Sequence, residues 1–100
     1  MIEFEYKMRA RVWLYPGAAA WHFVTLPAMQ SAKIKSLLGG ARRGWGSIPV
    51  LATVGKTSWK TSIFPDKASG GYVLPLKADV RKKENITADR VITFSIQIRP

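Results

Sequence analysis

The chain has 100 residues, of which 47% are hydrophobic and none is cysteine. This length and composition predict a single domain over residues 1–100 with a core of its own, and the missing thiols exclude disulfide scaffolds, thiolate metal sites and cysteine nucleophiles. Sixteen Lys and Arg against six Asp and Glu give a net charge of +10.

The first half of the chain predicts two strands and a helix. Residues 2–14 alternate, with apolar side chains at even positions and mostly charged ones at odd positions, which indicates a strand long enough to bend around a small barrel. Residues 20–26 read as a second strand, with Trp21 and Phe23 on one side and His22 and Val24 on the other. A short helix is expected over residues 31–38, ended by Gly39 and Gly40.

The second half predicts a hairpin, two more strands and a second helix. Strands 48–54 and 57–64 flank the tight turn Gly55-Lys56, and Pro65-Asp66-Lys67 begins a turn. A short strand over 72–76, a helix over 78–84 and an alternating strand over 90–99 follow, the last with Ile92, Phe94, Ile96 and Ile98 inward. We therefore expect a mainly β domain, a small barrel or pseudo-barrel of five to six strands with two short helices.

Five segments together resemble the bacterial and archaeal family called domain of unknown function 1905. They are Trp13-Leu14-Tyr15-Pro16-Gly17, Trp21-His22-Phe23-Val24, Arg43-Gly44-Trp45-Gly46-Ser47-Ile48-Pro49-Val50, Trp59-Lys60-Thr61-Ser62-Ile63-Phe64-Pro65 and Tyr72-Val73-Leu74-Pro75-Leu76-Lys77-Ala78-Asp79-Val80-Arg81-Lys82. The resemblance implies a double-split β-barrel, which is often a homodimer, and carries no established activity. The family usually has Gly near Asn85 and Gly-Asp near Asp89-Arg90; Asn85 and Asp89 also accept left-handed geometry, so the turn is expected to survive.

The positive charge is unevenly distributed. No residue between Glu5 and Asp66 is acidic, whereas nine are basic. Such a field attracts nucleic acid, acidic lipid surfaces and phosphorylated or carboxylated small molecules, although it can also simply keep a small domain soluble. No apolar stretch approaches the ~20 residues of a membrane span and no signal peptide opens the chain, so we expect a cytoplasmic protein.

The strongest candidate site is the loop that contains Arg42, Arg43, Trp45 and Ser47. Its glycines allow close approach of the backbone, its guanidinium groups match carboxylate or phosphate, and Trp45 offers a face for stacking. The loop could equally be a structural turn with Trp45 plugging one end of the barrel.

Two further groups extend this candidate site. Lys60 and Ser62 share the face of a strand opposite Trp59, and Lys77 and Arg81 lie one helical turn apart, with Lys82 beside them. A solvated sheet face and a solvated helix face are the alternative interpretations. A third basic stripe, Lys7, Arg9 and Arg11, could follow a phosphate backbone.

The remaining singular residues favour structural roles. His22 is the only histidine, and neither Asp66 nor Ser47 is placed beside it by spacing, so it is read as a strand residue packed between Trp and Phe. Trp13, Trp21 and Trp59 are read as core residues. No catalytic residues, metal site or cofactor motif is predicted.

Three functions remain open from the sequence. The first is a non-enzymatic module that binds an anionic ligand through Arg42, Arg43, Trp45, Ser47, Lys60, Ser62, Lys77 and Arg81. The second is nucleic-acid binding along the basic face. The third is an enzyme acting on a phosphorylated or carboxylated small molecule by electrostatic stabilisation. None of these hypotheses includes a membrane as partner.

Overall fold

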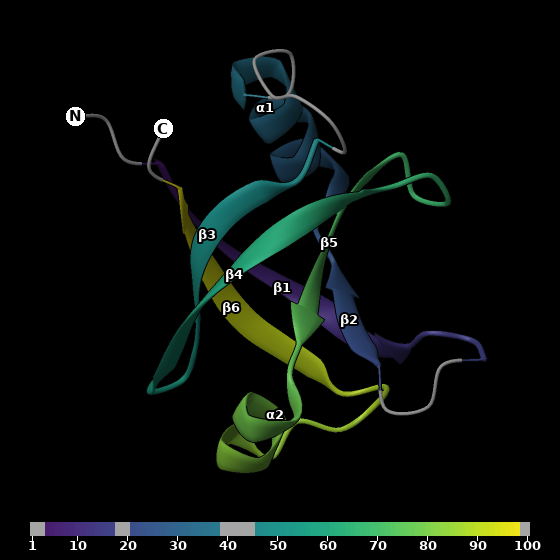
Figure 1. Cartoon of the computed structure of the whole chain (residues 1–100), viewed down its shortest axis with the longest axis vertical. Helices are drawn as coiled ribbons and strands as arrows, with labels where there is room; N and C mark the ends of the chain where they lie inside the picture. Colours follow the sequence, from purple (N-terminus) through teal and green to yellow (C-terminus); the bar gives the residue numbers. More distant parts are fainter. Residues whose placement is uncertain (1–3, 18–20, 39–45, 99–100) are drawn as a thin grey trace.

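The computed structural model describes residues 4–17, 21–38 and 46–98. These residues form β1 (Phe4–Leu14), β2 (His22–Thr25), α1 (Ala28–Leu38), β3 (Ile48–Val54), β4 (Thr57–Asp66), β5 (Gly71–Leu76), α2 (Ala78–Glu84) and β6 (Val91–Ile98). The strands close into an antiparallel barrel in the order β1-β2-β5-β4-β3-β6 (Figure 1). The expected mainly β barrel with two short helices is confirmed.

Strands β1 and β4 each take part in two ladders. β1 pairs with β6 from Phe4 to Arg11 and then with β2 from Val12 to Leu14. β4 pairs with β3 from Thr57 to Ile63 and then with β5 from Phe64 to Asp66. Because each strand changes partner along its length, it bends around the barrel, as the length of the alternating segment 2–14 had indicated.

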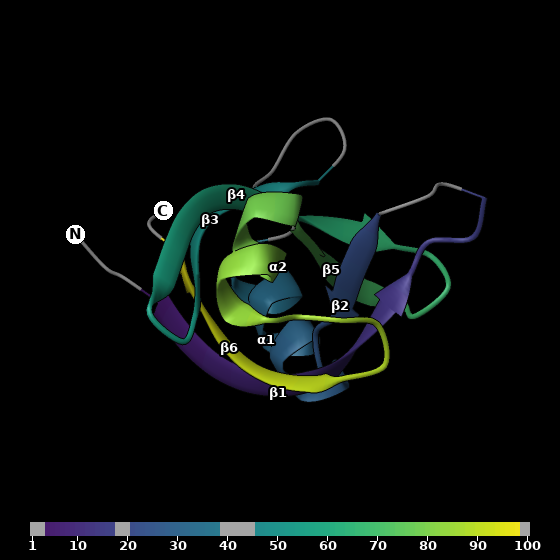
Figure 2. The ribbon, with the colours of Figure 1, turned by 90° about the horizontal axis from the view of Figure 1, so that it is seen from below.

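The core lies inside the barrel and follows the predicted alternation. The even-numbered residues of β6 from Ile92 to Ile98 are all buried, as are Met8 and Val12 of β1. Helices α1 and α2 cover the two ends of the barrel, and each contributes one deeply buried side chain, Ile34 and Val80 respectively (Figures 1 and 2). The structure therefore confirms the inward face predicted for the last strand.

Two of the three tryptophans predicted for the core are outside it. Trp59 is only 7% exposed and belongs to the core, but Trp21 is 60% exposed and Trp13 is half-buried on the outer face of β1. Val24 is fully buried, so β2 turns His22 and Val24 inward and Trp21 and Phe23 outward. Both faces of this strand are apolar, and a shift of the strand by one residue exchanges them. The sequence pattern alone therefore could not show which face points into the barrel.

Several predicted boundaries differ from those observed, most clearly at α1 and β4, whereas β3 and α2 have the expected bounds. Helix α1 begins at Ala28 rather than Ser31, because the Ser31 N–H already donates to the Pro27 carbonyl (3.0 Å). Strand β4 continues through Pro65, where a turn was expected. Proline is accepted there because the ladder with β3 has ended at Ile63, so no bond across to β3 is lost.

The connection from α2 to β6 turns through two left-handed residues. Asn85 has φ 52° and Asp89 has φ 70°, as expected for the positions where the related family usually carries glycine. The Arg11 Nη1 donates to the Asp89 carbonyl (2.9 Å), which ties this connection to β1. The prediction that the turn survives without glycine is confirmed.

Candidate ligand-binding site

The site is created where β4 and β5 separate. They pair with each other only through residues 64–66 of β4 and 71–73 of β5. The earlier residues of β4 pair with β3, and β5 pairs with β2 as far as Leu76. Figure 1 shows the two strands diverging toward α2. A wedge therefore opens in the barrel wall between the first half of β4 and the last residues of β5.

A proline explains why the ladder between β4 and β5 stops. The Leu26 N–H donates to the Tyr72 carbonyl (2.9 Å), so the backbone polar groups of Tyr72 point toward β2. Because this direction alternates along a strand, the backbone groups of Val73 and Pro75 point toward β4. Pro75 has no N–H to donate across to β4. The sequence therefore ends the pairing at the point where the wedge opens.

The wedge contains a cavity of about 430 Å³, within the usual range for small-molecule pockets. Its wall comes from β2, β4, β5 and α2, and consists of Trp21, His22, Trp59, Lys60, Thr61, Pro75, Leu76, Lys77, Ala78 and Arg81. Three of the eight predicted binding residues, Lys60, Lys77 and Arg81, thus line one cavity.

Of the other five predicted residues, only Ser47 and Ser62 belong to the described part of the chain. Ser62 and Ser47 are half-buried, and neither lines this cavity. Arg42, Arg43 and Trp45 lie outside the described residues, so the prediction that they bind a ligand stays a prediction.

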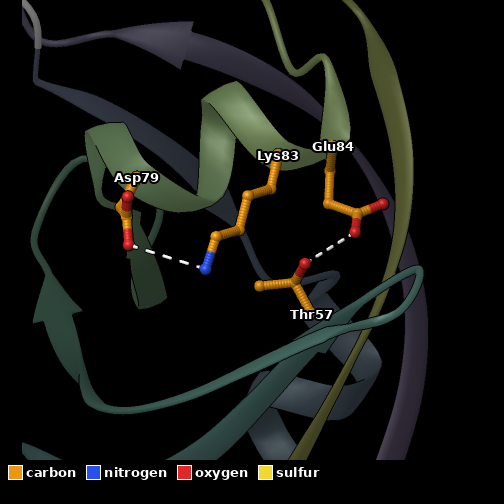
Figure 3. Close-up of polar contacts among 4 residues, drawn as sticks. All are labelled: Thr57, Asp79, Lys83 and Glu84. Atoms are coloured by element: carbon orange, nitrogen blue, oxygen red, sulfur yellow. Dashed lines mark hydrogen bonds and ion pairs between the residues drawn. The ribbon is translucent and has the colours of Figure 1, made fainter.

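The described part of the chain contributes no carboxylate to the cavity wall. The two acidic residues of α2 have partners elsewhere (Figure 3): Asp79 pairs with Lys83 (3.8 Å), and Glu84 accepts a hydrogen bond from the Thr57 hydroxyl (2.6 Å). The Lys56 N–H also donates to Glu84 (3.3 Å). The lining therefore carries an excess of positive charge.

Arg81 is held against the wall by the junction of β5 and α2. Its Nε donates to the Leu76 carbonyl (3.0 Å), and its backbone N–H donates to the Lys77 carbonyl (3.1 Å). A guanidinium group that is anchored through Nε can direct its terminal N–H groups at an oxyanion in a planar fork. Lys77, in extended conformation just before the helix, adds a second cation from the same junction.

A comparison with known protein families decides the classification. The sequence profile described as Domain of unknown function (DUF1905) matches residues 9–96. The chain belongs to the DUF1905 family. The resemblance seen in the sequence is confirmed, and a comparison of this DUF1905 domain with curated proteins gave no match.

In this DUF1905 domain, His22 is half-buried on the inner face of β2 and lines the cavity. It pairs across the ladder with Leu76, whereas Asp66 pairs with Gly71 at the other end of β5, roughly 16 Å away along the strand at about 3.3 Å per residue. The Asp66 carboxylate accepts the Ser69 N–H (3.1 Å). His22 and Asp66 therefore do not form an acid–base pair.

The described residues of the DUF1905 domain offer no group of three His, Asp or Glu side chains that could hold a metal ion. Nor does any helix among them combine the length and apolar character needed to span a bilayer.

Sequence reasoning missed the contributions of Trp21, His22 and Pro75 to the cavity. They meet Lys60 and Arg81 only because β5 lies between β2 and β4 in the barrel order. The one available signal was Pro75 within an apolar strand, since a proline in such a run indicates an edge or an interruption of pairing.

Proposed function

We propose that this DUF1905 domain is a non-enzymatic binding module for a small anionic ligand, which occupies the cavity between β4 and β5. The observation that carries the proposal is the meeting of Lys60 from β4, Lys77 from the β5–α2 junction and Arg81 from α2 on one wall, to which the described residues contribute no carboxylate. The free-energy cost of moving the ligand's charge out of water is then offset by hydrogen bonds from three cationic side chains.

The apolar part of the cavity strengthens such binding. Trp59 and Leu76 are buried core residues that reach the wall, and Pro75 contributes no N–H. Charges next to apolar groups are screened less than charges in open water, so each hydrogen bond to an anion is stronger there. A module of this kind needs no general base, which agrees with the separation of His22 from Asp66.

The experiment is calorimetric titration with phosphate, pyrophosphate, citrate and benzoate at low salt. The variant Lys60→Met/Lys77→Met keeps the aliphatic stems and removes two positive charges from the wall. We expect it to lose about 1–3 kcal/mol of binding free energy, a fall in affinity of about 5- to 150-fold.

The matched control is Lys33→Met/Lys82→Met, which changes the net charge equally at two exposed lysines that do not line the cavity. It should bind within about twofold of the wild type. Equal losses in both variants would show that the anion responds to the overall charge and not to the cavity.

Nucleic-acid binding is the second candidate function, favoured by the outer face of β1. Lys7, Arg9 and Arg11 are exposed along this face, beside the polar Ser95 and Thr93 of β6. Binding there predicts affinity for DNA or RNA that falls linearly with salt on a logarithmic scale. Lys7→Met/Arg9→Met should lower that slope and leave binding of the small anions unchanged.

A further inference from the structure

Four aromatic side chains gather on the outer face of β1 and β2. Phe23, only 8% exposed, is the centre: its ring centroid lies 5.1 Å from that of Trp13, 6.1 Å from that of Tyr15 and 6.0 Å from that of Trp21. Because three rings surround it, Phe23 is covered although it lies outside the barrel. Of the three surrounding rings, Trp21 and Tyr15 are exposed, whereas Trp13 is half-buried.

Trp21 belongs both to this aromatic cluster and to the cavity wall. It contacts the cluster through Phe23 and lines the cavity together with Lys60, Lys77 and Arg81. Its carbonyl accepts the Tyr15 N–H (2.9 Å), which fixes its backbone where β2 begins. An indole that packs against Phe23, is 60% exposed and lines a cationic cavity offers a π-face to whatever enters.

We infer that the ligand of this cavity is a flat aromatic ring that carries a phosphate or carboxylate group. The ring stacks on Trp21, and the anionic group is bound by Lys60, Lys77 and Arg81. This inference rests on the proposed function and adds to it the class of ligand. Stacking on an indole requires that the ligand has a flat π-face, whereas binding by the three cations requires only that it carries negative charge.

The chemistry of the walls fits the two parts of such a ligand. Trp59, Pro75 and Leu76 provide apolar surface that can cover the ring when it leaves water. The cations come from β4 (Lys60), from the junction of β5 and α2 (Lys77) and from α2 (Arg81). An aliphatic anion would use the cations and leave the indole uncovered. A neutral aromatic would cover the indole and make no use of the positive charge on the wall.

The test compares pairs of probes that share charge but differ in the ring. Benzoate is set against cyclohexanecarboxylate, and adenosine monophosphate against ribose 5-phosphate, each titrated by calorimetry into the wild-type chain. We expect the aromatic member of at least one pair to bind about 5- to 150-fold more tightly. Preference in the first pair identifies an aromatic carboxylate, and preference in the second a nucleotide-like phosphate; either supports the inference.

Variants at the rim assign the preference to Trp21. Trp21→Ala and Trp21→Leu should abolish it, whereas Trp21→Phe should retain most of it. Tyr15→Ala is the matched control, because Tyr15 belongs to the aromatic cluster and does not line the cavity. Trp21→Leu keeps an apolar side chain, so the test remains valid if the alanine variant fails to fold.

The possible failures are distinguishable. Equal affinity within both probe pairs overturns the aromatic ligand and leaves anion binding intact. A ring preference that survives in Trp21→Leu overturns the stacking on Trp21. If no anion binds the wild type, both proposals fail. An affinity that rises with the length of an oligonucleotide and depends steeply on salt overturns the small ligand in favour of a nucleic acid.

Discussion

Ser31 connects α1 to the barrel, and replacing it tests whether this one hydroxyl fixes the helix in place. It is a buried polar side chain, 5% exposed, and its Oγ accepts the N–H of Tyr72 (3.2 Å). The same hydroxyl makes a longer contact to the Leu26 carbonyl (3.4 Å). Ser31→Ala removes the acceptor for a buried N–H, which costs about 1–3 kcal/mol.

Part of that cost is offset by the backbone. Alanine is favoured over serine in a helix by about 0.5 kcal/mol, so the net loss of unfolding free energy should be about 0.5–2.5 kcal/mol. For a domain of this size each kcal/mol lowers the melting temperature by about 4–8 °C. The measurement is urea denaturation followed by tryptophan fluorescence, with thermal unfolding as a second reading.

Ser36→Ala is the control in the same helix, because Ser36 is exposed and carries only the propensity change. It should raise the unfolding free energy by about 0.5 kcal/mol.

A second control uses Gly71, where an added Cβ would lie 2.6 Å from the Ser31 Oγ. Gly71→Ala should therefore destabilise the domain less in the Ser31→Ala background, by at least about 0.5 kcal/mol. Equal stabilities of Ser31→Ala and Ser36→Ala would refute the role assigned to the buried hydroxyl.

Three further substitutions have distinct expected outcomes in the same denaturation assay. Gly55→Ala should cost about 1–2 kcal/mol more than Gly17→Ala: both positions have positive φ, but the new methyl group at 55 would also displace the Glu84 carboxylate from the hairpin. Trp59→Ala should cost about 3–5 kcal/mol because it empties part of the core, and an unchanged midpoint would contradict the burial of this indole. Lys83→Ala should change stability by less than about 0.5 kcal/mol, since its ion pair with Asp79 lies within α2 and is exposed; a larger loss would show that this pair stabilises the helix.

Much of the architecture was predictable because local signals agreed with the tertiary structure. The alternation from Val91 to Ile98 has one apolar face, so only one face can be buried, and Gly55-Lys56 fixes the register of its hairpin. Strand β2 was different: with apolar residues on both faces, its inner side is chosen by Val24 packing inside the closed barrel.

The sequence predicted the charged residues of the site but not the other residues that line the cavity. Lys60, Lys77 and Arg81 stand out as cations within structured segments, and the structure places all three on one cavity. That Trp21 lines the same cavity depends on the spatial order of β2, β5 and β4, which no local pattern contains.

The pairing of the first strand with the last has a consequence for how the molecule is made. β1 and β6 match residue by residue from Phe4 opposite Ile98 to Arg11 opposite Val91. During synthesis β1 must wait until β6 has left the ribosome, with its apolar side chains uncovered in the meantime. Contacts of such long sequence separation slow folding and expose nascent strands to aggregation, so the barrel can close only after β6 has been translated.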